Sequence, residues 1–176
     1  MAFSIDTERL ALRLRTEDDA ECNLKLLQLH EGGTTLSLDE VAQRMVERNN
    51  QAQEVGFGVL SIRRLNESDA IGYCGLIVGR SSYDEPEIAY EILPQFQGHG
   101  YATEAARAVV YAAFATGRER IWATVGTWNA PSFRVLEKNG FTAHHTDTGE
   151  NGEFVWMVRT HQIELVRPPG TDHGFQ

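Results

Sequence analysis

Near the middle of the chain, a strand, a turn with two glycines and a helix follow one another without a spacer. Segment 87–93 alternates as a strand does, and an alanine-rich helix begins at Tyr101. Gly98 and Gly100 lie between them, and without a Cβ they let the main chain curl so that its N–H groups point into one concavity. The helix start adds unpaired N–H donors and partial positive charge. This pattern predicts a phosphate site made of main-chain atoms, and a purely structural turn is the alternative.

Two common phosphate-binding motifs do not match this turn. A P-loop requires a lysine directly after its second glycine, and no such lysine follows here. A dinucleotide-binding fingerprint requires a third glycine, but Ala102 and Thr103 stand in its place. The next expected strand, 121–127, also ends without the acidic residue that would bind a ribose. A dinucleotide-binding domain is therefore disfavoured and remains a third alternative.

The other segments predict one mixed α/β domain. Capping boxes at 16–19 and 37–40 begin two helices, and a run of strands follows. We expect a single domain over residues 1–160 and a tail over 161–176. The expected strands are 9–15, 57–63, 70–78, 87–93, 120–127, 142–146 and 154–160, and further helices are expected from 101 and over 131–138.

The charge of the chain excludes some partners. Its 176 residues include 16 Lys+Arg and 25 Asp+Glu, a formal net charge of −9. Nucleic acids and anionic membranes require a basic surface, so we expect neither as a partner; the excess of acid favours basic acceptors only weakly. The 2 cysteines lie far apart, which predicts no disulfide framework and no metal site. The first residues lack a signal-peptide pattern, which predicts a cytoplasmic protein.

Two motifs resemble one family. Residues 95–100, QFQGHG, resemble the Q/R-x-x-G-x-G/A signature of the GNAT superfamily of N-acetyltransferases. EIAY at 87–90, GHGYATEA at 98–105 and NAPSFRVLEKNGF at 129–141 are similar to its RimJ/RimL-like branch. The resemblance covers nearly all of residues 7–160 in the same order. It implies an α/β fold with a central mixed, mostly antiparallel twisted sheet flanked by helices.

The resemblance also implies acetyl-CoA as co-substrate. Main-chain N–H groups of the glycine turn would hold the pyrophosphate, and main-chain groups around Ile92 and Leu93 would pair with the pantetheine arm like an added strand. Asn129 would bond the arm from the opposite side, or cap the helix that follows it, or do both. The residues expected at this site are Ile92, Leu93, Gln95, Gln97, Gly98, His99, Gly100, Tyr101, Ala102 and Asn129.

Acetyl transfer to an amine requires a base and an acid. The amine attacks only when neutral, although a free α-amino group has a pKa of about 8 and a lysine about 10.4. Alternation places Glu87 and Glu91 on one face of their strand. Glu87 stands where the family's strand glutamate commonly serves as base, so we expect it first in this role and Glu91 second. A solvent-facing carboxylate without a catalytic role is the alternative for each.

The acid that protonates the leaving thiolate is harder to assign. Many GNAT enzymes have a tyrosine where this chain has Leu136. The RimJ/RimL-like branch instead has a serine at the position of Ser132, which predicts that Ser132 is the acid. A first-turn serine that bonds the main chain, with water as the acid, is the alternative.

Several functional alternatives stay open. The predicted N-acetyltransferase moves an acetyl group directly to a primary amine, either a protein N-terminal α-amine, as in RimJ/RimL-like enzymes, or a small amine. A non-catalytic acyl-CoA-binding regulatory module is the alternative class. A homodimer is compatible with the sequence. His144 and His145 are expected on opposite faces of a strand, and the tryptophans, Trp128 among them, in the core.

Overall fold

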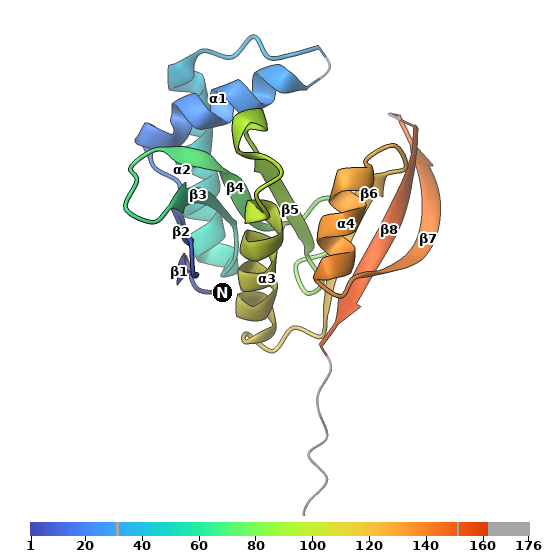
Figure 1. Ribbon diagram of the computed structural model, residues 1–176. Helices are drawn as coiled ribbons and strands as arrows, with labels where there is room; N and C mark the ends of the chain where they lie inside the picture. The colour runs from blue at the N-terminus through green and yellow to red at the C-terminus, as the bar shows by residue number, and fades with distance from the viewer. Residues whose placement is uncertain (31, 151, 162–176) are drawn as a thin grey trace, which may run out of the picture.

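The computed structural model describes residues 1–30, 32–150 and 152–161. Within them, eight strands form one sheet in the order β1-β2-β3-β4-β5-β6-β8-β7, and every neighbouring pair is antiparallel except β5 and β6 (Figure 1). The strands are β1 (Ser4–Asp6), β2 (Leu10–Leu14), β3 (Val59–Arg64), β4 (Ala70–Ile77), β5 (Glu87–Ile92), β6 (Arg120–Gly126), β7 (Thr142–Gly149) and β8 (Gly152–Thr160). The helices are α1 (Ala20–Leu29), α2 (Leu38–Val55), α3 (Tyr101–Phe114) and α4 (Ala130–Lys138), with 3-10 turns η1 (Glu17–Asp19) and η2 (Pro94–Phe96).

This architecture confirms the predicted mixed, mostly antiparallel sheet flanked by helices. Both predicted capping boxes form, and in the second the Ser37 N–H donates to the Glu40 carboxylate at 2.8 Å while the Glu40 N–H donates to the Ser37 hydroxyl at 3.3 Å. Strand β1 was not predicted, because three residues are too short to show an alternation. The chain therefore begins its sheet one strand earlier than the sequence pattern indicates.

Helices cover the two faces of the sheet differently (Figure 1). Helix α3 packs on one face, where its apolar side chains join those of β2 to β6 in the main core. Helices α1 and α2 form a smaller cluster on the other side, built on Ala20, Val41 and Met45. Ile88 and Ile92 of β5 belong to the main core, whereas Ala89 and Glu91 line a cavity under α1 and α2. Strand β5 thus separates the α3 layer from the layer of the first two helices.

Strands β5 and β6 meet at one end and then separate. They share the single register pair Glu87↔Trp122, and the Trp122 N–H donates to the Pro86 carbonyl at 2.9 Å. By contrast, β4 and β5 are paired over six residues, and β6 and β8 over seven. A gap in the hydrogen-bond ladder therefore opens beyond Glu87 and leads toward the turn that precedes α3.

The hairpin of β7 and β8 contains an irregularity that corrects one expectation. The register shifts between Ala143 and His145, which is typical of a β-bulge. The two histidine rings consequently lie against each other, with Nδ1 atoms 2.7 Å apart, rather than on opposite faces. His144 packs edge-on against Trp122, and His145 stacks on Trp156.

The chain ends differ in how much the structure describes. The expected tail 161–176 lies outside the described residues except for His161, whose N–H donates to the Glu119 carbonyl at 2.8 Å. In the part of the chain that is described, no helix is both long and apolar enough to cross a membrane.

Candidate active site

The glycine turn has the geometry of an anion site. Gly98 and Gly100 both have φ of +80°, a conformation that residues with a Cβ rarely adopt. Within the described residues, the main-chain N–H groups of 98–102 find no acceptor, and α3 begins at Tyr101. The Gln97 N–H is different, because it already donates to the Pro94 carbonyl at 3.2 Å. Free donors therefore converge at the start of α3, beginning one residue later than we expected.

Side chains from outside the turn fix its position. The Arg9 guanidinium donates to the His99 carbonyl at 3.0 Å and to the Glu104 carboxylate at 2.7 Å. Thr7 donates to the same carboxylate at 2.6 Å. On the other side, the Gln97 side chain donates to the Ile92 carbonyl at 2.8 Å. The turn is thus tied to the residues just before β2 and to the end of β5, which keeps the free N–H groups in place.

The gap between β5 and β6 leaves main-chain groups free. Because the Leu93 N–H bonds the Ile71 carbonyl on β4, alternation turns the groups of Tyr90 and Ile92 toward β6. The Leu93 carbonyl accepts from Phe96, so neither of its polar groups is free. Of the two residues that we expected to pair with an extended arm, only Ile92 therefore presents a free N–H. Tyr90, which had no expected role, joins it.

Helix α4 faces this gap from the β6 side. Asn129 caps the helix, because its Oδ1 accepts from the Ser132 N–H at 3.2 Å. The Tyr90 hydroxyl crosses the gap and donates to the Ser132 carbonyl at 3.2 Å. Burial raises the pKa of Tyr90 to about 12, so this hydroxyl stays protonated at neutral pH. Leu136 is fully buried, and Trp128, expected in the core, is 78% exposed.

The two glutamates of β5 have different surroundings. Glu87 is 2% exposed, and its carboxylate accepts hydrogen bonds from the N–H groups of Arg80 and Ser81 and from the Thr124 hydroxyl. Both of its oxygens are therefore occupied where β5 meets β6. This arrangement suits a carboxylate that holds the β4–β5 loop and β6 together.

Glu91 instead lines an open cavity under α1 and α2. Its Oε2 accepts from the Tyr73 hydroxyl at 3.2 Å and lies 3.2 Å from His30 Nε2. Burial raises the pKa of Tyr73 to about 12, and the nearby Glu91 carboxylate adds to the increase. Glu91 is thus the strand glutamate that faces a space where a second substrate can bind.

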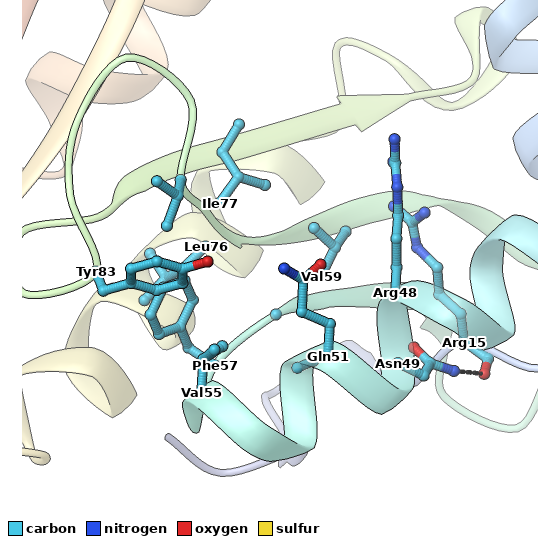
Figure 2. Close-up of a pocket in the computed structure, with 13 residues that line it drawn as sticks. Arg15, Arg48, Asn49, Gln51, Val55, Phe57, Val59, Leu76, Ile77 and Tyr83 are labelled. Atoms are coloured by element: carbon cyan, nitrogen blue, oxygen red, sulfur yellow. Dashed lines mark hydrogen bonds between the residues drawn. The ribbon is translucent and has the colours of Figure 1, made fainter.

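Two adjoining cavities lie between α2 and the sheet. One has a volume of about 210 Å³ and the other of about 420 Å³, and they share Arg15, Arg48, Val59 and Ile77. Figure 2 shows the larger one. Arg15 is 7% exposed, and its burial lowers the pKa to about 10. Sequence analysis did not identify these arginines, because neither belongs to a motif. The sequence carried a signal for Arg48 alone, because Arg44 lies four residues before it on the same helix face.

Together these features describe a passage with two ends. The glycine turn offers main-chain donors for a diphosphate, and the gap between β5 and β6 offers free strand groups to an extended, amide-containing arm. Ala89 and Glu91, which follow Glu87 on the same strand, line the smaller cavity. The glycine turn, the gap and the smaller cavity therefore all adjoin β5 or its C-terminal end.

Comparisons with known proteins point to the same chemistry. The model of a family described as an acetyltransferase (GNAT) domain matches residues 9–142. The uncharacterized N-acetyltransferase YoaA of Bacillus subtilis is 32% identical over 144 residues, which cover 78% of this chain and 81% of YoaA.

Solved structures share the fold at lower identity. A putative GnaT-family acetyltransferase from Bordetella pertussis superposes with a TM-score of 0.77 at 22% identity, over 89% of this chain and 99% of that one. The ribosomal-protein-S5-alanine acetyltransferase from Vibrio fischeri has a TM-score of 0.76 at 18% identity, over 92% of this chain and 98% of that one.

Proposed function

Because the chain belongs to the GNAT family of acetyltransferases, we propose that it acetylates a small primary amine in the cavity between α2 and the sheet. The chain is an N-acetyltransferase with RimJ/RimL-like relatives, and acetyl-CoA is its donor. The gap between β5 and β6, which joins the glycine turn to this cavity, is the observation that carries the proposal.

The donor site is proposed from unpaired main-chain groups. The N–H groups of residues 98–102 would hold the pyrophosphate, with Gln95 and Gln97 shaping the turn before them. The free main-chain groups of Tyr90 and Ile92 would bond the pantetheine arm, and Asn129 would bond it from α4 with the side-chain amide that its cap leaves free. These residues fit acetyl-CoA without a basic side chain, since helix and turn dipoles favour anions.

The choice of a small acceptor rests on the acceptor cavity. The cavity that Glu91 lines has a volume of about 210 Å³, which suits a small primary amine. The acceptor's amine would enter beside Ala89 and Glu91, and the proposal requires the thioester end of the pantetheine arm to lie there as well. Acetylation of a protein N-terminus is the competing assignment.

We assign the base role to Glu91 and a positioning role to Glu87. Glu91 lines the acceptor cavity, where it can take a proton from the amine directly or through water. Glu87 already accepts three hydrogen bonds and holds the two strands at the closed end of the gap. Ser132, at the start of α4, remains the proposed donor to the leaving thiolate, and the Tyr90 hydroxyl holds that helix against β5.

A two-arm acetylation assay tests this function. The full chain is incubated with acetyl-CoA and either a panel of small primary amines or a panel of peptides with free N-termini. Thiol release and product mass are then measured. We expect turnover with small amines and, in the Glu91→Gln variant, a loss of turnover with unchanged CoA binding. Turnover with peptides alone would overturn the small-amine assignment.

A further inference from the structure

We propose that the acceptor carries a carboxylate beside its amine, and that Arg15 and Arg48 bind this carboxylate. The inference rests on the proposed function, because it names the class of substrate that the cavity selects. The expected acceptor is an amino acid or a close analogue, with its amine toward Glu91 and its acidic group toward the two arginines.

Arg15 is a buried cation without an anionic partner. It is 7% exposed and lines both cavities, and its guanidinium forms no hydrogen bond or ion pair with any described residue. It forms a cation–π contact with Tyr73, whose ring centroid lies 4.9 Å from the guanidinium carbon. The nearby buried acid, Asp19, is paired with Arg63 instead. Because this guanidinium lines both cavities and has no carboxylate partner among the described residues, an anion bound there would supply its counter-charge.

A second guanidinium stands beside the first. Arg48 extends from α2 toward the sheet next to Arg15, as Figure 2 shows, and its positive charge contributes to the lowered pKa of Arg15. Arg44 lies one helical turn before Arg48 and lines the smaller cavity. Like charges four residues apart destabilise a helix, and neither arginine is paired with a carboxylate in the described structure. This clustering favours an anionic ligand, and guanidinium groups suit a carboxylate because they bind it bidentately.

The cavity charges contrast with those of the chain. Although the net charge is −9, among the residues that the structure describes no acid lines the larger cavity and Glu91 is the one acid that lines the smaller one. Arg44 and Arg48 lie on α2, whereas Glu91 lies on β5 near the gap between β5 and β6. A molecule that carries both an amine and a carboxylate matches this distribution of charge. Its amine would lie beside the acetyl donor, and its carboxylate would lie beside the arginines.

Matched acceptors test the proposal. Acetylation of L-alanine, L-methionine and L-phenylalanine is compared with that of ethylamine, 3-(methylthio)propylamine and 2-phenylethylamine, which lack only the carboxylate. 1-Aminoethylphosphonate replaces the carboxylate of alanine by a phosphonate and separates these two anions. We expect kcat/KM to be about 10- to 100-fold higher for at least one amino acid than for its matched amine, as a charge-assisted contact provides.

Variants assign that preference to the arginines. Arg48→Gln changes an exposed side chain and should keep the fold, whereas Arg15→Met tests the buried cation. Arg107→Gln removes an exposed arginine of α3 and is the matched control. We expect the first two variants to reduce the preference toward unity, mainly through KM, and the control to keep it. If Arg15→Met does not fold, Arg48→Gln alone decides.

Failure of the proposal differs from failure of the proposed function. Turnover of small amines without preference for the carboxylate, or with a preference that both arginine variants keep, overturns the inference and leaves the proposed function standing. A preference for the phosphonate over alanine overturns the carboxylate assignment. If no small amine turns over, calorimetry with the three amino acids in the presence of CoA decides separately. Binding that is lost in Arg48→Gln supports the arginine site, and no binding to the wild-type chain overturns it.

Discussion

The Thr124 hydroxyl donates to the Glu87 carboxylate at 2.8 Å, across the junction of β5 and β6. This bond lies two residues beyond Trp122, the partner of Glu87 in the one register pair that the two strands share. It therefore marks the point where the ladder ends and the gap begins. Since the same carboxylate also accepts from the N–H groups of Arg80 and Ser81, one side chain sets where the gap closes.

Replacing Glu87 should therefore affect stability as well as turnover. In Glu87→Gln the amide oxygen can accept from Arg80 and Ser81 and the amide N–H₂ can donate to the Thr124 hydroxyl, but all three bonds lose a charged partner. We therefore expect a loss of about 1–3 kcal/mol in the free energy of unfolding. Thr124→Val removes one of the donors, and we expect a smaller loss of about 1 kcal/mol. Urea denaturation measures both. If Glu87→Gln loses turnover without any loss of stability, Glu87 is the base rather than a positioning residue.

Replacing Gly100 should weaken CoA binding beyond the effect of strain. Gly100→Ala places a Cβ on a residue with φ of +80°, which costs about 1–2 kcal/mol. Gly117→Ala introduces the same kind of strain at φ of +89°, in the turn after α3, and is the matched control. We expect similar losses of stability in both variants, and weaker CoA binding by calorimetry in Gly100→Ala alone. Equal CoA affinity in the two variants would place the pyrophosphate elsewhere.

Glu91→Gln tests the base directly. Removing a general base typically lowers the rate 10²- to 10⁴-fold, and we expect a loss in kcat in this range. Because Tyr73 and His30, each at 3.2 Å, are the only hydrogen-bond partners of the Glu91 side chain among the described residues, stability and CoA affinity should stay near those of the wild-type chain. Stopped-flow thiol release between pH 6 and 9 measures the change. Wild-type rates in this variant would remove Glu91 from the mechanism.

The glycine turn should become less stable in acid. Burial raises the pKa of Glu104, but hydrogen bonds from Thr7 and Arg9 outweigh it and leave the pKa below its ordinary value. A depressed carboxyl pKa stabilises the folded chain above the unfolded pKa, near 4.5, and this stability is lost as pH falls through the folded value. In Glu104→Gln we expect a shallower loss of stability between pH 5 and 3. Thermal unfolding of the two chains at matched pH values checks this, and parallel curves would contradict it.

The order of the helices and strands along the chain, and the glycine turn, were predictable because both depend on local sequence patterns. Strand alternation, the capping boxes and the glycines at 98 and 100 each involve only a few neighbouring residues, and the structure contains them all. The turn's N–H donors were located to within one residue. The family resemblance added the mixed, mostly antiparallel sheet flanked by helices, whereas the order of the strands was not predicted.

The acceptor side was not predictable for a physical reason. Arg15 follows β2, Arg48 lies on α2 and Glu91 lies on β5, so only the tertiary fold brings them to one cavity. The different surroundings of Glu87 and Glu91 also depend on a loop and a neighbouring strand. The bulge near His144 reverses the direction of one side chain, which an alternating pattern does not indicate.

A crystal structure of the chain with CoA tests the account most directly. The measured quantities are the positions of the pyrophosphate and the sulfur relative to the protein. We predict the pyrophosphate within hydrogen-bond distance of the N–H groups of 98–102, and the pantetheine arm bonded to Tyr90 and Ile92 between β5 and β6. The sulfur should lie between Ser132 and the cavity lined by Glu91. A pyrophosphate bound away from the glycine turn, or an arm outside the gap, would contradict the account.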